Sequence, residues 1–186
     1  MNGWLVIAPA AKTAVAAILL PAGVAKLGDR QGFVDVVRGF AILPDAAVPA
    51  FATGLPVAEL LVGVALLSGV LFDWSLAAWA GLAAMCLFAT FGIAIATNLV
   101  RGRTDISCGC FGRNSRRRLT WGLVGRVLCC LAICALTLPV VHQGATPSGD
   151  LKDRASAALI GAAAVAMIWL GRFVITAGSA GFSQSS

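Results

Sequence analysis

The chain has 186 residues, of which 59% are apolar and only 12% are charged, and its mean hydropathy is +0.91. Soluble domains are typically about 45–50% apolar and about 25% charged. The composition excludes a disordered chain, a coiled coil and an ordinary soluble enzyme, and it predicts one integral membrane domain over residues 1–186. The net charge of +6 comes mainly from basic residues between apolar segments, with no nucleic-acid motif, so no nucleic-acid partner is predicted.

Five apolar segments are each long enough for a membrane-spanning helix of about 20 residues. None alternates like a β-barrel strand, so the predicted fold is all-α, a polytopic membrane helix bundle. Four segments form a core over residues 7–141, residues 142–177 add a loop and a fifth transmembrane helix, and residues 178–186 form a tail. The predicted spans are Ile7–Ala25, Phe51–Phe72, Leu76–Val100, Leu119–Val141 and Ala155–Ala177.

The segment between the first two spans, Lys26–Ala50, is too polar to cross a membrane. Within it, Gly32–Phe40 has the pattern of a short amphipathic helix that lies at the membrane interface and ends before Pro44. A plain packing helix that covers the bundle is the alternative. The predicted apolar face carries Phe33, Val36, Val37 and Phe40, and the predicted polar face carries Asp35 and Arg38.

Basic residues are concentrated in two loops. The loops after the first and third spans carry nine Lys and Arg, whereas Lys152 and Arg154 are the basic residues on the opposite side. Because basic loops stay in the cytoplasm, this distribution predicts that both loops are cytoplasmic and that the N-terminus is outside.

Two of the six cysteines, Cys108 and Cys110, lie in the polar loop after the third span, and Gly109 separates them. Such a pair can close a small, strained and therefore reducible disulfide, and the neighbouring arginines favour the reactive thiolate. The pattern predicts a redox pair. A permanent loop disulfide, two inert thiols and a site for soft Cu(I) or Hg(II) ions are the alternatives. A structural zinc is not predicted, because it needs about four ligands.

The other cysteines lie in apolar spans. Cys130 and Cys134 share a helical face with Arg126, and helical rise places Cys86 at a similar depth to Cys134, about 21–22 Å. Cys86, Cys130 and Cys134 could therefore form a buried relay for the loop pair. The alternative is that they are small apolar packing residues.

Glu59 is the clearest polar anomaly within a span, because a charge at a helix centre costs about 2.5–3.5 kcal/mol on insertion scales. Counted from the helix ends, Glu59 and Arg126 lie at similar depths of about 12 and about 10 Å, which predicts that they pair. Lys26 is expected at the same patch. The pair is either an inter-helix clamp or a proton-holding site beside the thiols.

The loop sequence Cys-Gly-Cys-Phe-Gly, residues 108–112, follows an Arg-Gly run between two apolar spans. It resembles the MauE family of methylamine-utilisation membrane proteins, which are relatives of DoxX. Ala22–Leu27, Leu55–Leu60 with its glutamate, and Arg126 also match that family. The likeness covers residues 10–141.

The resemblance implies a four-helix core in a bacterial inner membrane. It also implies maturation or export of a disulfide-rich periplasmic client, in the family the methylamine dehydrogenase small subunit, with a thioredoxin-like, MauD-like partner. Such a protein would act as a thiol–disulfide oxidoreductase. A soft-metal-handling protein, a quinone-linked oxidase and a non-enzymatic assembly factor are the alternatives, although no cofactor or quinone motif is evident. The implied redox pair is Cys108 and Cys110, supported by Gly109, Phe111, Gly112, Glu59, Arg126 and Lys26.

Overall fold

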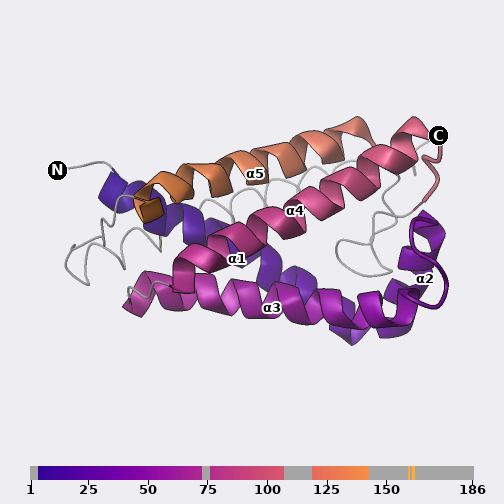
Figure 1. Ribbon diagram of the computed structural model, residues 1–186, viewed down its shortest axis with the longest axis horizontal. Helices are drawn as coiled ribbons and strands as arrows, with labels where there is room; N and C mark the ends of the chain where they lie inside the picture. The colour runs from indigo at the N-terminus through magenta and orange to yellow at the C-terminus, as the bar shows by residue number, and fades with distance from the viewer. Residues whose placement is uncertain (1–3, 73–75, 107–118, 143–158, 160, 162–186) are drawn as a thin grey trace, which may run out of the picture.

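The computed structural model describes residues 4–72, 76–106, 119–142, 159 and 161. The regular elements of these residues are α-helices, and Figure 1 shows four long ones running side by side with a short one, α2, at one end. The helices are α1 (Trp4–Gly28), α2 (Arg30–Phe40), α3 (Val48–Phe72), α4 (Leu76–Val100) and α5 (Trp121–His142).

The four predicted core spans are confirmed as helices. The third, Leu76–Val100, coincides with α4, and the others begin or end within a few residues of the predicted bounds. Of the predicted fifth span, only Leu159 and Gly161 lie within the described residues, so that span is not tested. Three helices are long and apolar enough to cross a membrane, over Ile7–Gly28, Val48–Val70 and Trp79–Val100, and α5 has a shorter apolar stretch, Trp121–Ala135.

The outer surface of the bundle is apolar. Large apolar side chains on α1, α3, α4 and α5 are exposed where a soluble protein would place charges. Hydroxyl groups in the long helices donate to carbonyls of their own helix, as Thr13 does to Pro9 and Thr97 to Ile93. This is the surface of a multi-pass membrane protein. The exposed side chains include Ile7, Val24, Leu61, Val64, Trp79, Leu82, Ile93, Trp121 and Leu128.

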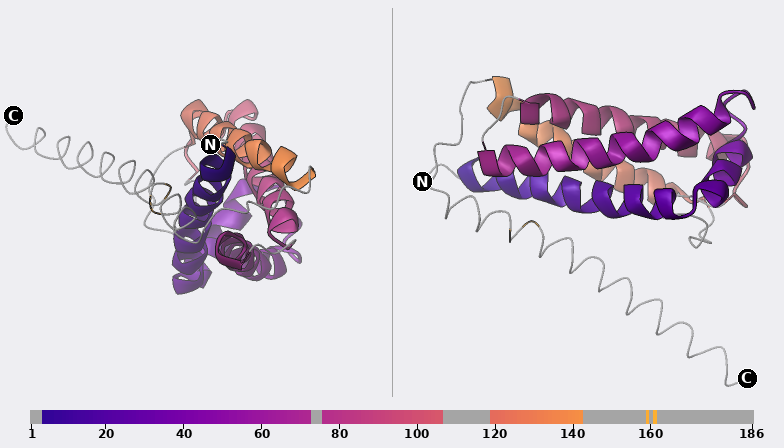
Figure 2. Two further views of the ribbon diagram at one scale, coloured as in Figure 1. Left: turned by 90° about the vertical axis from the view of Figure 1, so that its left-hand side faces the viewer. Right: turned by 90° about the horizontal axis from the view of Figure 1, so that it is seen from below.

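The middle of the bundle is a tightly packed apolar region, here called the central core. It is formed by side chains from α1, α3, α4 and α5, and α1 and α3 run side by side along it (Figure 2). Small residues allow the close approach: a Cβ at Gly63 would lie 2.8 Å from the Leu20 side chain. The buried members are Val15, Ala16, Leu19, Leu66, Ala80, Ala84, Phe88 and Cys134.

The helices α1 and α3 are antiparallel and do not end at the same level at the α2 end of the bundle; this difference in level is here called the step. Gly63 faces Leu20 and Gly23 faces Leu60, which sets Gly28, the end of α1, opposite Leu55. The first residues of α3 therefore project about 10 Å beyond α1. The short helix α2 packs against this projection.

The amphipathic prediction for α2 is confirmed. Its apolar face packs on the projecting part of α3, while Asp35 and Arg38 are exposed on the other face. Burial of one face explains how an 11-residue helix, too short to be stable alone, is held in place. The packed residues are Phe33, Val36 and Val37 of α2 with Val48, Ala52 and Leu55 of α3.

Candidate functional site

A buried ion pair joins α1 to α3 at the step. Lys26, in the last turn of α1, donates from Nζ to Oε1 of Glu59, in the middle of α3. Each side chain is only 1% exposed. These are among the few charged or polar side chains buried within the described residues, and they meet because the register of the two helices places them opposite each other.

Two aromatic rings surround the lysine ammonium. Nζ of Lys26 lies 5.3 Å from the ring centre of Phe33, on α2, and 4.6 Å from that of Phe91, on α4. Cations at this distance from an aromatic face are attracted by the ring, more strongly where water is excluded. Four helices therefore contribute to one group, here called the charged site: Lys26, Phe33, Glu59 and Phe91.

The charged site is expensive to bury. Removing two charges from water costs several kcal/mol per ion, on the order of the attraction that the pair regains. An apolar pair of the same volume would stabilise the bundle at least as well. The charged site therefore calls for an explanation beyond stability.

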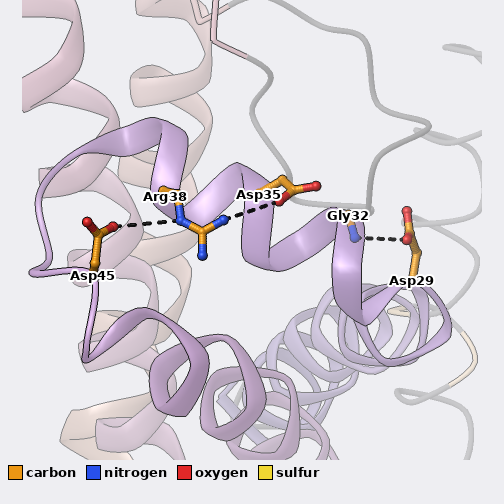
Figure 3. Close-up of polar contacts among 5 residues, drawn as sticks. All are labelled: Asp29, Gly32, Asp35, Arg38 and Asp45. Atoms are coloured by element: carbon orange, nitrogen blue, oxygen red, sulfur yellow. Dashed lines mark hydrogen bonds and ion pairs between the residues drawn. The ribbon is translucent and has the colours of Figure 1, made fainter.

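The helix that covers the charged site has specific caps at both ends, and Figure 3 shows the N-terminal cap. At its N-terminus, Oδ1 of Asp29 accepts from the backbone N–H of Gly32 at 3.0 Å. A Cβ on residue 32 would lie 2.3 Å from Oδ2 of Asp29, so a larger residue here would displace the capping carboxylate. At its C-terminus, Ala41 adopts a left-handed conformation with φ 49°, and its N–H donates to Arg38 O.

Arg38 also links α2 to the following loop. Its guanidinium lies 3.5 Å from Asp35, within α2, and 3.7 Å from Asp45, as Figure 3 shows. All three side chains are exposed, so each ion pair contributes about 0–1 kcal/mol.

The end of α4 is fastened to the C-terminus of α2. Arg103 donates from one guanidinium nitrogen to Phe40 O at 3.4 Å and to Oδ1 of Asn98 at 3.5 Å, and Arg101 donates to Ala41 O at 3.4 Å. Asn98 is fully buried. Both arginines bind carbonyl groups at the end of α2. Their predicted roles in topology and thiol activation stay predictions.

The loop with the predicted redox pair starts and ends at this place. Ile106 and Phe40 pack against the same apolar cluster, and the backbone N–H of Leu119 donates to Thr104 O at 3.1 Å, so both ends of the loop lie at the α2 end of the bundle. The charged site lies toward the same end. Cys108, Gly109, Cys110, Phe111 and Gly112 are outside the described residues, so their roles remain predictions.

The predicted pairing of Glu59 with Arg126 is wrong. Glu59 pairs with Lys26, whose presence at this patch is confirmed, whereas Arg126 is exposed on α5. The prediction failed because it compared only the depths of Glu59 and Arg126 along their helices, and depth does not determine which face of a helix a side chain lies on: Arg126 lies on an exposed face of α5.

The predicted cysteine relay is not assembled. Cys134 is buried in the central core and Cys130 is half-buried beside it, but Cys86 is exposed on α4. Cys86 and Cys134 therefore do not meet inside the bundle. Cys134 and Cys130 pack as apolar residues do, which is the alternative given for them.

Sequence reasoning missed the aromatic rings and the buried amide. Phe33 and Phe91 look like ordinary apolar residues in sequence, and only the packing of α2 and α4 brings their rings to the lysine. Asn98 did carry a signal, since it is an amide within an apolar span. Among the described residues, no three His, Cys, Asp or Glu side chains gather as a metal site.

Comparisons with known proteins agree on one family. The family model described as Methylamine utilisation protein MauE matches residues 4–139. The chain is 41% identical to the Methylamine utilization protein MauE of Paracoccus versutus over 140 residues, which cover 74% of this chain and 73% of the relative. It is 37% identical to that of Paracoccus denitrificans over 151 residues, covering 81% and 77%, and 35% identical to that of Methylophilus methylotrophus over 158 residues, covering 84% and 78%. No solved structure matches the chain.

Proposed function

Because this chain belongs to the MauE family, we propose that it supports methylamine utilisation as a membrane protein that exchanges disulfides through Cys108 and Cys110. The observation that carries the proposal is the position of the loop. Its described ends are joined by the Leu119–Thr104 hydrogen bond and packed at the C-terminus of α2, so both ends of the segment that contains the two thiols are anchored at this end of the bundle.

The proposed reaction is an exchange with a thioredoxin-like protein. The thiolate of one cysteine attacks the partner's disulfide, which gives a mixed disulfide and releases a partner thiolate. The second cysteine then attacks its neighbour's sulfur, so the Cys108–Cys110 disulfide forms and the partner leaves as a dithiol. Two electrons pass to the partner, and the two thiol protons end on its sulfur atoms. The same steps in reverse would oxidise the partner. With a cytoplasmic loop, redox equivalents must also cross the bilayer to reach an exported, disulfide-rich client, whereas a loop on the outer side would exchange with its partner there directly.

The proposal includes an orientation. The two basic loops share one end of the bundle, and the positive-inside rule places that end in the cytoplasm of a bacterial inner membrane. A membrane-impermeant thiol reagent tests this directly, with exposed Cys86 and Cys129 replaced by serine to remove background labelling. Labelling of Cys108 only after the membrane is permeabilised would agree with the proposal, and labelling in intact cells would contradict the orientation.

The chemistry is tested by trapping the mixed disulfide. In the Cys110→Ser or the Cys108→Ser variant the second attack cannot occur, so an adduct with a thioredoxin-like protein should accumulate and disappear on reduction. Acid quenching, alkylation and non-reducing electrophoresis reveal it. The matched control is Cys129→Ser, an exposed cysteine on α5, which should give no adduct.

Three outcomes would contradict the exchange reaction. If the Cys108→Ser, Cys110→Ser double variant supports methylamine utilisation fully, the protein is a non-enzymatic assembly factor. Thiols that stay reduced without any adduct, together with a tightly bound Cu(I) or Hg(II) ion, would indicate metal handling. Oxidation of the pair by an added quinone with no protein adduct would indicate a quinone-linked oxidase.

A further inference from the structure

The second carboxylate oxygen of Glu59 is the anomaly of the charged site. Oε1 accepts from Lys26, but Oε2 is buried and receives no hydrogen bond from any described residue. A carboxylate has acceptor sites for about four donors, and a buried polar atom without a hydrogen bond, above all a charged one, destabilises the folded protein. A simple inter-helix clamp gains nothing from this cost.

No other charged side chain on the packed helices neutralises Glu59. On α2, the charged residues are engaged elsewhere or face outward: Asp29 caps Gly32, Arg30 donates to Thr53, and Asp35 and Arg38 pair with each other. The helix α4 contributes Phe91 to the charged site, and Arg126 of α5 is exposed. Among the described residues, the charge of the site is therefore set by Lys26 and Glu59 themselves.

The aromatic rings suit a site whose carboxylate can become neutral. If Oε2 takes a proton, Lys26 loses the full negative charge beside it and remains a buried cation. The rings of Phe33 and Phe91, at 5.3 and 4.6 Å, still attract that cation. The two rings thus stabilise Lys26 beside a neutral Glu59. A permanent ion pair, in which Glu59 always keeps its charge, would not need this stabilisation.

The backbone of α3 offers a hydrogen-bond acceptor for the carboxyl group of Glu59 once it is protonated. Pro56 has no N–H, so the carbonyl of Ala52 lacks its usual helical donor. The Ala52 carbonyl points along α3 toward Pro56. Side chains on a helix lean toward its N-terminus, so the Glu59 side chain leans toward that same turn. Both Ala52 and Pro56 are buried on the side of α3 that faces the bundle.

We propose that Glu59 Oε2 is a proton-binding site and that the charged site takes up and releases one proton at this atom. The proton comes from water at the α2 end of the bundle, the site changes from neutral to positive, and no oxidant or reductant takes part. The short helix α2, with Phe33 against Lys26 and its polar face outward, is the cover between this site and water. The inference does not rest on the thiol chemistry.

Infrared difference spectroscopy of the full chain in lipid nanodiscs, titrated from alkaline to acid pH, tests the proposal. A protonated carboxyl band should appear reversibly, shift in D2O, and be missing from a Lys26→Met, Glu59→Gln double variant, which leaves no unpaired charge and so should fold. The Asp35→Asn variant, which changes an exposed carboxylate of α2, should keep the band.

The same titration of a Cys108→Ser, Cys110→Ser variant should give the same band, which separates this proposal from the thiol reaction. The proposal is overturned if no band depends on Glu59 at any pH at which helix content and size-exclusion profile show a folded protein. The pair would then be a permanent clamp.

Discussion

The central core and the charged site share three long helices, α1, α3 and α4, but bury different kinds of side chain. The central core contains Leu19, Leu66, Phe88 and other apolar residues, packed around close helix contacts. The charged site, toward the α2 end, buries an ammonium, a carboxylate and two aromatic rings. One short helix, α2, covers the charged site, whereas the described residues of the central core all come from the long helices.

The difference shows that two regions of a membrane bundle can have separate roles: one provides close packing, and the other determines how the helices are aligned. Lipid tails are as apolar as leucine, so apolar packing between helices depends on close fit and tolerates many arrangements. Two buried charges, in contrast, must lie next to each other, because any other alignment of the helices leaves each charge unpaired in an apolar environment. The charged site can therefore fix the register of α1 against α3, while the central core supplies close packing.

The largest effect is expected from breaking the ion pair on one side only. Lys26→Met should lower the free energy of unfolding by about 3–5 kcal/mol, because the Glu59 carboxylate is left buried without its counterpart. Glu59→Gln should lower it by less, because the rings of Phe33 and Phe91 still attract the lysine ammonium. The double variant should recover most of this loss. Unfolding in mixed detergent micelles, arranged as a double-mutant cycle, measures the coupling.

A swap of the two residues provides the control. The Lys26→Glu, Glu59→Lys variant keeps both charges in the site and should be more stable than either single reversal. If the effects of the two single changes simply add in the double variants, Lys26 and Glu59 are not coupled, and the contrast with the central core is lost.

A smaller effect is expected from filling the close contact of α1 with α3. A Cβ at Gly23 would lie 2.9 Å from Cγ of Leu60 and 3.0 Å from Pro56 O, so Gly23→Ala should cost about 1–3 kcal/mol of unfolding free energy. Gly54, on α3, has open space around it. Gly54→Ala is the matched control and should be neutral or stabilising by up to about 1 kcal/mol. Equal effects at the two positions would show that close fit does not limit this contact.

Much of the fold could be predicted because the membrane simplifies the problem. The four core spans follow from runs of apolar residues, and the faces of α2 follow from its helical period. The step between α1 and α3 could not be predicted. It depends on which small residues face which leucines, as Gly23 faces Leu60, and hydropathy does not encode that.

The candidate site was predicted only in part. The sequence marks Glu59 as anomalous, since a charge within an apolar span needs a partner, but it leaves several cations to choose from. Arg126 matched the count of residues from the helix ends, whereas Lys26 matches the register. The roles of Phe33, Phe91 and Oε2 depend on tertiary contacts, and no pattern in the chain identifies them.

The smallest effect is expected at the contact that fastens α2, where both partners are close to water. Arg103 donates to Phe40 O and to buried Asn98, whereas Arg101 makes a single bond to Ala41 O. The Arg103→Gln variant should therefore lose about 0.5–1.5 kcal/mol of local stability, and Arg101→Gln should lose less. Hydrogen exchange of the α2 amides, followed by mass spectrometry, measures both, because a loosened C-terminus opens more often. Faster exchange confined to α2, and greater for Arg103→Gln, would show that the cover of the charged site can move independently of the central core. Equal acceleration in all five helices would show instead that α2 and the central core unfold as one unit.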